Sequence, residues 1–240
     1  MFRKSNFKLN WKYAMGELVL IFLGISLAIA FQNWNEERKN RIELQSILSN
    51  LETELKEDSA SYELTFQRLE FREKNISQLQ DYFRNQPKQI DSARTALSII
   101  TAGFITTYYP GFAVYSELLG SGKLSLVKSE EIKKALASYQ SNVSIGQSLD
   151  AIYHTYSKEL EKNLVSYLSV APDIVGYDTI PPASFAHIRF DLSKMSRDKE
   201  LMNDLKYTQY YTKIERTYKQ NAVMPSLDSL LLLIRNELKK

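Results

Sequence analysis

The chain has 240 residues, 44% of them hydrophobic, and only eight glycines and six prolines. Its formal net charge is +3, but the first twelve residues hold four of the 31 basic side chains and none of the 28 acidic ones. The remainder is close to neutral, which excludes the concentrated basic face that nucleic-acid binding requires. The absence of cysteine excludes disulfides, thiol catalysis and thiolate metal sites.

Residues 13–34 predict a transmembrane helix, because no other segment is both long and apolar enough to enter a bilayer. An α-helix of this length spans roughly 33 Å, close to a hydrocarbon core of about 30 Å. Trp11 and Tyr13 lie at one end of the segment and Trp34 at the other. Amphipathic rings favour the headgroup level, so these three residues mark both boundaries of the predicted membrane anchor.

Three further residues of the anchor suggest specific roles. Glu17 lies about one turn inside the boundary, where it can reach headgroup water or pair with Lys12 or Lys8. A carboxylate within a span is otherwise a functional hypothesis, because burying it unpaired is costly. Gly24 and Ala28 lie four residues apart on a stripe of small side chains, a pattern that allows another helix to approach closely. The span therefore favours the lipid bilayer as partner, together with another membrane protein or a second copy of the chain.

The charges that flank the anchor predict its orientation, since cationic flanks remain in the cytoplasm. Residues 1–12 form a basic tail that we expect inside the cell, and everything after Trp34 is expected outside. In a two-membrane bacterium this is an inner-membrane protein with a periplasmic domain. The alternative is a cleaved signal peptide with its site at Ala28-Ile29-Ala30, although the segment continues into a helical pattern without a turn.

Asn35 to Asn85 predicts one long helix that continues the anchor, because apolar residues recur at steps of four and three with no glycine or proline. We expect it to be the first helix of a bundle with Leu51, Leu55 and Leu69 in the core. A coiled-coil stalk covered by a second copy is the alternative. Asp58 and Arg72 fall on the same inward stripe, and we interpret them as a solvated or mutually satisfied pair.

The remaining sequence predicts further helices, so the expected fold is all-α, with a bundle over residues 35–240 that we treat as one domain. A short helix follows an N-cap at Asp91 or Ser92, and a long one follows Ser129 and runs to Ala171. The last helix begins near Asp198 and must kink or restart at Pro225. The apolar face predicted for its first part consists of Leu201, Leu205, Tyr207, Tyr211, Ile214 and Tyr218.

Residues 172–196 lose helical periodicity and form the longest irregular stretch, which is where functional loops often occur. A weak candidate site lies there, made of His187, Arg189 and Asp191. The other histidine, His154, is interpreted as a surface or hydrogen-bonded residue of the bundle. No catalytic motif, metal-ligand spacing or cofactor motif is present in the sequence, so we expect no cofactor.

Three segments resemble an uncharacterised family of single-span membrane proteins from Bacteroidota: MGELVLIFLGISLAIAFQNWNEERK, VYSELLGSGKLSLVKSEEIKKALASY and YTQYYTKIERTYK. The resemblance implies an anchored helical protein and no particular activity. The expected function is an interaction, scaffold or sensing module without catalysis. The alternative is a membrane-anchored enzyme or small-ligand-binding domain whose site lies near residues 172–196.

Overall fold

The computed structural model describes residues 11–86, 89–169, 185 and 187–239. In chain order the elements are α1 (Trp11–Asn85), α2 (Ser92–Ala102), α3 (Ala113–Gly120), the 3-10 helix η1 (Lys123–Leu126), α4 (Glu130–Val165), α5 (Leu192–Met195), α6 (Lys199–Tyr218), the π-helix η3 (Lys219–Val223) and α7 (Met224–Leu238). The described residues contain no strand, only an isolated antiparallel bridge between Leu168 and Phe190. The all-α prediction is confirmed.

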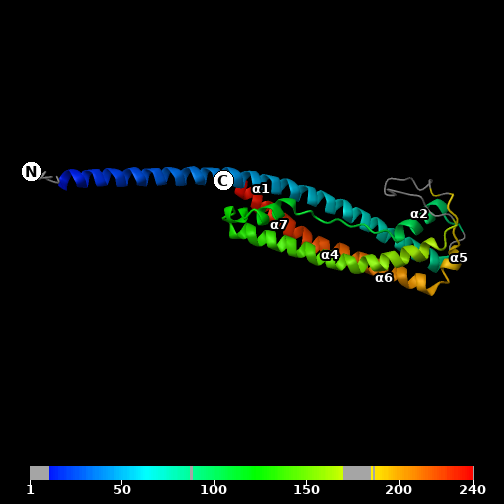
Figure 1. Ribbon diagram of the computed structural model, residues 1–240. Helices are drawn as coiled ribbons and strands as arrows, with labels where there is room; N and C mark the ends of the chain where they lie inside the picture. Colours follow the sequence, from blue (N-terminus) through cyan, green and yellow to red (C-terminus); the bar gives the residue numbers. More distant parts are fainter. Residues whose placement is uncertain (1–10, 87–88, 170–184, 186, 240) are drawn as a thin grey trace, which may run out of the picture.

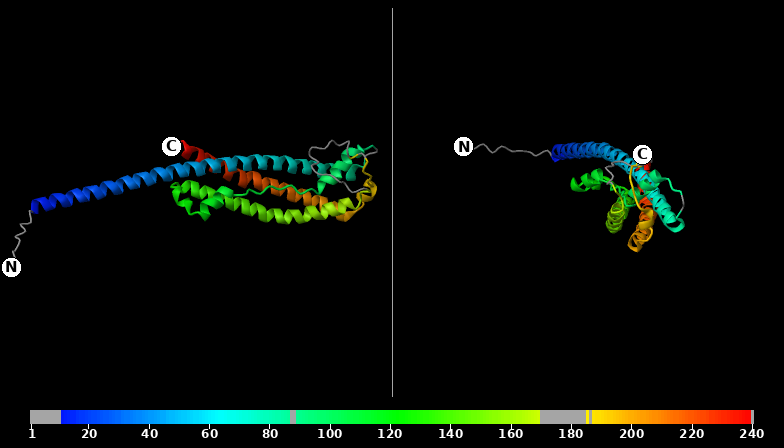
Figure 2. Two further views of the ribbon diagram at one scale, coloured as in Figure 1. Left: turned by 45° about the horizontal axis from the view of Figure 1, so that its top comes forward. Right: turned by 90° about the vertical axis from the view of Figure 1, so that its right-hand side faces the viewer.

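Helix α1 is continuous over 75 residues, about 110 Å at 1.5 Å per residue. Its first part projects well beyond the other helices, and its second part forms one edge of the bundle (Figures 1 and 2). An 18-residue window of this projecting part has a mean hydropathy of 2.0, and none of it is buried within the molecule. The anchor and the first bundle helix are thus a single element, as the sequence predicted.

The bundle is formed by α1, α4, α6 and α7. Helices α6 and α7 pack against both α1 and α4, so the C-terminal helices lie between the other two. The core nearer the anchor includes Leu48, Leu51 and Leu55 of α1, Val143 of α4 and Leu230 of α7. The chain's own helices cover this stripe, so the bundle and not a lone stalk buries these leucines.

A second apolar core lies at the end of the bundle away from the anchor. It contains Ile76 and Leu79 of α1, Leu160 of α4, and Leu201 and Leu205 of α6. Leu69, which the sequence also placed in the core, is fully buried between the two regions. The three predicted core leucines are therefore confirmed.

Side-chain caps define where three of the helices begin. Asp91 accepts a hydrogen bond from the amide of Arg94 at 3.0 Å, and Ser129 accepts one from Ile132 at 3.2 Å. Asp198 accepts from the amides of Glu200 and Leu201. These oxygens satisfy amides that lack a partner within the helix, which is why the polar residues before each apolar run predicted the starts correctly.

Gly103 is the C-cap of α2 and lies directly against α4. A β-carbon added to Gly103 would lie 2.7 Å from the Cα and the Cβ of Glu161. A contact this short with backbone cannot be relieved by moving a flexible side chain. Only glycine therefore permits the observed approach of α2 to α4.

The end of α4 was predicted incorrectly. The helix stops at Val165 instead of Ala171, and the chain beyond it makes extended contacts. The amide of Ser169 donates to the carbonyl of Arg189 at 3.0 Å, next to the Leu168–Phe190 bridge. Leu168 and Phe190 pack against the apolar residues at the end of the bundle away from the anchor. The apolar residues after Val165 are thus used by tertiary packing, and not by another helical turn.

The chain does change its helical form before Pro225, as predicted. Residues Lys219–Val223 form a π-helix, and α7 then begins with Pro225 in its first turn. Proline has no amide hydrogen to donate to the preceding turn, so a locally wider turn accommodates it. Within α6 the buried residues recur alternately four and three positions apart. From Glu215 onward the spacing is four positions throughout, through Lys219, Val223 and Leu227.

Candidate functional site

A buried layer of charged side chains lies between the two apolar cores. Lys219 of η3 places its Nζ 2.9 Å from Oδ2 of Asp150 on α4 and 2.8 Å from Oε1 of Glu215 on α6. The three side chains are only 3%, 1% and 2% exposed. Arg72 of α1 is also buried, so the layer contains two cations and two carboxylates, contributed by four elements.

Burial and charge have opposite effects within this layer. Burial disfavours the charged form of Lys219, but the carboxylates of Glu215 and Asp150 outweigh it and raise the pKa of Lys219. Burial raises the pKa of Glu215, although the charge of Lys219 acts in the opposite direction. Burial also lowers the pKa of Arg72 to about 10. A layer of this kind adds little stability over an apolar one, but a change to one partner leaves an uncompensated charge.

Arg72 binds three different parts of the chain. Its guanidinium donates to the carbonyl of Phe104 at 2.5 Å, to Oγ of Ser157 at 3.1 Å, and to the hydroxyl of Thr212. Its Nε, like Oδ1 of Asp150 and Nε2 of His154, has no hydrogen-bond partner among the described residues. The interpretation of Asp58 and Arg72 as a solvated or mutually satisfied pair is wrong, because both are buried and each has partners of its own.

Asp58 is held between two tyrosines from distant parts of the chain. The hydroxyl of Tyr108 donates to its Oδ1 at 2.5 Å and that of Tyr139 to its Oδ2 at 2.8 Å. Burial raises the pKa of Asp58, and the two phenol donors only partly oppose this. The ring of Tyr108 also meets that of Tyr62 edge-on at 5.1 Å. This carboxyl group therefore fixes the segment after α2 against α1 and α4.

The inward face of α4 shows how sequence could have located this layer. Its buried residues follow an unbroken alternation of three and four steps: Ile132, Leu136, Tyr139, Val143, Gly146, Asp150, Tyr153, Ser157, Leu160 and Leu164. Extending that spacing strictly, without favouring apolar residues, places Asp150 and Ser157 inside. A choice by hydrophobicity selects the neighbouring Leu149 and Tyr156 instead and misses the polar positions.

The predicted face of α6 needs a similar correction. Its buried residues are Leu201, Leu205, Thr208, Thr212 and Glu215, not the tyrosines. Tyr207 and Tyr210 are 53% and 60% exposed. Tyr211 stacks on Tyr156 of α4 at 4.5 Å between ring centroids, and Tyr156 stacks on Tyr207 at 5.8 Å. A tyrosine face thus runs along α4 and α6, defined by the exposed Tyr207 and Tyr210 and the partly exposed Tyr156 and Tyr211.

Two of the three residues of the predicted weak site form local hydrogen bonds. The Asp191 carboxylate accepts from the amide of Lys194 at 2.9 Å and caps α5. The carbonyl of Arg189 accepts from Ser169, and His187 is exposed. Most of the surrounding stretch, residues 170–184 and 186, lies outside the described residues. His154 is partly exposed, and burial lowers its pKa. Within the described ranges no group of three or more His, Asp or Glu side chains is placed to hold a metal.

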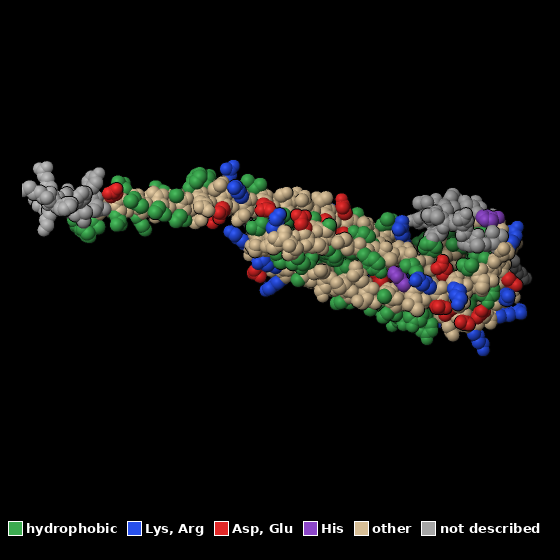
Figure 3. Space-filling model, viewed as in Figure 1, with side chains coloured by type: hydrophobic (Ala, Val, Ile, Leu, Met, Phe, Trp, Pro, Cys, Tyr) green, Lys and Arg blue, Asp and Glu red, His purple; other side chains and the backbone are tan. Residues whose placement is uncertain are grey.

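The projecting part of α1 leaves its apolar surface uncovered. Trp11 is 69% exposed and Trp34 56%, and a β-carbon on Gly24 would meet nothing within 4 Å. Glu17 and Ala28 are exposed too, whereas the side chain of Tyr13 is outside the described part. Figure 3 shows hydrophobic side chains around this rod. An apolar surface of this size requires a bilayer or another protein to cover it.

These features define a helical bundle carried on an N-terminal helix that is long and apolar enough to cross a membrane. The chain belongs to a family of unknown function (DUF6090), whose sequence pattern matches residues 17–166. The match begins at Glu17 in the apolar part of α1 and ends just after α4, so it excludes α6 and α7. No curated protein matches the chain. No solved structure matches it either.

Proposed function

We propose that the protein is a single-pass protein of the bacterial inner membrane, as in the Bacteroidota proteins that it resembles. Residues 1–12 face the cytoplasm and the bundle faces the periplasm. The bundle serves as an interaction, scaffold or sensing module and has no catalytic activity. The observation that carries this proposal is the continuity of the uncovered apolar rod with the bundle helix in α1.

This continuity supports a function in presenting a surface at a fixed distance from the bilayer. From Asn35 to Asn85 α1 extends about 75 Å at 1.5 Å per residue. Neither glycine nor proline interrupts it between Gln32 and Asn85. Helices α6 and α7 pack against this part of α1. Elements at the far end, including α2 and α5, are therefore held well away from the membrane (Figure 1).

The distribution of polar and aromatic groups supports recognition rather than catalysis. The charged side chains of Lys219, Asp150 and Glu215 are buried inside the bundle, where the lysine pairs with both carboxylates. The tyrosine face is exposed instead, and Figure 3 shows hydrophobic side chains gathered over α6. Tyrosine is enriched at protein interfaces, because its rigid ring buries apolar area while its hydroxyl remains hydrogen-bonded. This face is the proposed recognition surface for a protein partner.

Site-specific photo-crosslinking in the native host tests the proposal. A photoreactive residue would replace Tyr210 in the full chain, and a matched chain would carry it at the exposed Glu63 of α1. We expect a discrete covalent adduct from position 210 that is absent from position 63. The same adducts from both positions, or none from either, would overturn the assignment of the tyrosine face as the recognition surface.

A further inference from the structure

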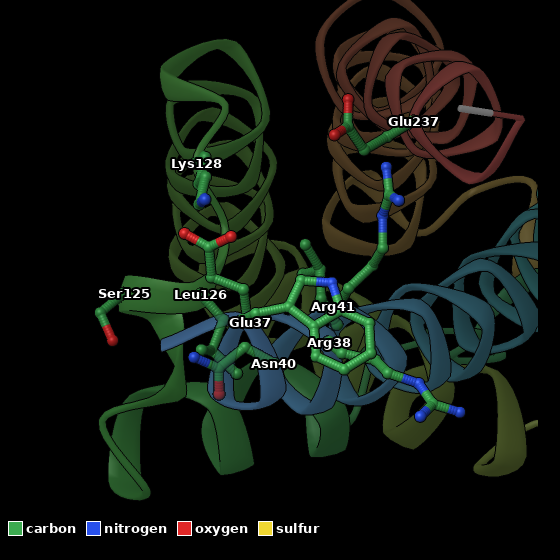
Figure 4. A pocket seen from close by; sticks show the side chains of 10 residues that line it. Glu37, Arg38, Asn40, Arg41, Ser125, Leu126, Lys128 and Glu237 are labelled. Atoms are coloured by element: carbon green, nitrogen blue, oxygen red, sulfur yellow. The ribbon is translucent and has the colours of Figure 1, made fainter. Parts of the chain in front are cut away.

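A cavity of about 770 Å³ lies at the end of the bundle nearest the anchor. Three parts of the chain line it: the beginning of the bundle part of α1, the segment from η1 toward α4, and the last turn of α7. Figure 4 shows Lys128 and Glu237 on two separate elements, across the cavity from the labelled side chains of α1. The C-terminal helix, through Glu237, therefore contributes to this cavity together with α1 and the segment before α4.

The cationic side chains of this cavity differ from nearby cations, because no carboxylate of the described residues pairs with them. Arg38, Arg41 and Lys128 are all exposed, and none forms an ion pair with a described carboxylate. Nearby, Lys123 pairs with Glu43 at 2.8 Å and Arg235 with Glu52 at 3.0 Å. The lining also includes the carboxylates of Glu37 and Glu237. The three cations thus exceed the two carboxylates, and their charges remain available to a ligand.

The position of the arginines relates the cavity to the membrane surface. Trp34, Arg38 and Arg41 share one face of α1, because they lie four and seven residues apart. Arg38 is about 6 Å and Arg41 about 10 Å beyond Trp34 along the helix axis. With the Trp34 ring at headgroup level, the guanidinium groups lie at the depth of the lipid phosphates and just above them.

We propose that this cavity binds the phosphate of an anionic phospholipid from the leaflet that contains Trp34. A guanidinium group provides paired donors that match phosphate oxygens, and Lys128 adds a point charge from the opposite wall. The acyl chains of the same lipid then lie along the uncovered apolar surface of α1, which a free phosphate cannot use. The bound headgroup links α1 to the segment before α4 at the membrane surface. This inference rests on the proposed membrane anchoring.

Lipid retention by the full chain provides the test. The chain is reconstituted with phosphatidylcholine alone or mixed with phosphatidylglycerol, and the lipids that remain bound after gentle extraction are measured by native mass spectrometry. The variant Arg38→Gln/Arg41→Gln/Lys128→Gln removes the unpaired cations. The control Lys123→Gln/Lys133→Gln/Arg235→Gln removes the same charge from the same end of the bundle, but from cations that already have carboxylate partners.

We expect the unmodified chain and the control to retain phosphatidylglycerol in preference to phosphatidylcholine. The cavity variant should lose at least about tenfold of that retention, since each cation near an anionic surface adds to the attraction. An equal loss in both variants, or no preference in the unmodified chain, would overturn the site. Competition by inorganic phosphate as effective as the lipid would overturn the lipid as ligand. A chain that fails to float with either vesicle would overturn the anchoring, and the site with it.

Discussion

Lys219 and Asp150 lie 2.9 Å apart at the centre of the bundle, although 69 residues separate them in the chain. The contact joins the π-helix to α4, and Glu215 completes it from the preceding turn. Because these groups are almost fully enclosed, water cannot compensate for the loss of one of them. The π-helix is therefore fixed by a specific buried contact and not only by the proline that follows.

Replacing Lys219 with Met should destabilise the fold strongly. The change leaves Asp150 and Glu215 buried without their cation, and breaking a buried pair in this way costs about 3 to 5 kcal/mol. The measurement is denaturant unfolding of the full chain in micelles, followed by circular dichroism. Lys56→Met is the control, because its ion pair with Glu52 is on the surface and solvent already screens it. Similar effects of the two changes would contradict the structural importance of the buried layer.

The environment of Asp58 predicts a particular pH dependence. Its raised pKa means that the folded chain binds the proton more tightly than the unfolded chain, so this group contributes stability as the pH falls through the folded pKa. The free energy of unfolding of the unmodified chain, relative to Asp58→Asn, should rise as the pH falls from neutrality toward the ordinary value of 3.8. Paired unfolding curves across that range measure it. A difference that shrinks on acidification would show that the phenols, and not burial, dominate.

A methyl group at Gly103 should force α2 away from α4. Gly103→Ala places the new carbon 2.7 Å from backbone and Cβ atoms of Glu161, and relief of such overpacking typically costs about 1 to 3 kcal/mol. Gly111→Ala is the matched control, because its added carbon meets nothing within 4 Å. Thermal unfolding of both variants makes the comparison. Equal midpoints for the two variants would mean that the approach of α2 to α4 is looser than described.

The proposed orientation predicts where a reporter will be active. An enzyme that works only in the periplasm, fused after Lys240, should be active in intact cells. Replacing Arg3, Lys4, Lys8 and Lys12 together with neutral residues should scramble the orientation, since these cations provide the charge asymmetry. Activity only from a cytoplasmic reporter would reverse the orientation. The mass of the purified chain tests the signal-peptide alternative separately, because cleavage after Ala30 removes the anchor.

The elements that sequence predicted best depend on local chemistry. The continuity of α1 beyond Gln32 follows from the lack of glycine and proline there, and the starts of α2, α4 and α6 follow from capping side chains within three residues. What the sequence could not provide depends on distant partners. Nothing near Asp58 indicates that Tyr108 and Tyr139 will bind it, and nothing near Arg38 indicates that Lys128 will face the same cavity. The irregular stretch that carries His187, Arg189 and Asp191 remains a prediction as a site.

The single helix that joins anchor and bundle acts mechanically as a lever. Its uncovered apolar part is the short arm, and the bundle part, about 75 Å long, is the long arm. Because α1 has no break at the membrane surface, a change of about 10° in the tilt of the span would move the far end of the bundle by roughly 13 Å. Tilt of this order lies within the range found for membrane helices. In the proposed anchoring, a change in bilayer thickness or in a neighbouring helix would therefore shift the position of α2 and α5.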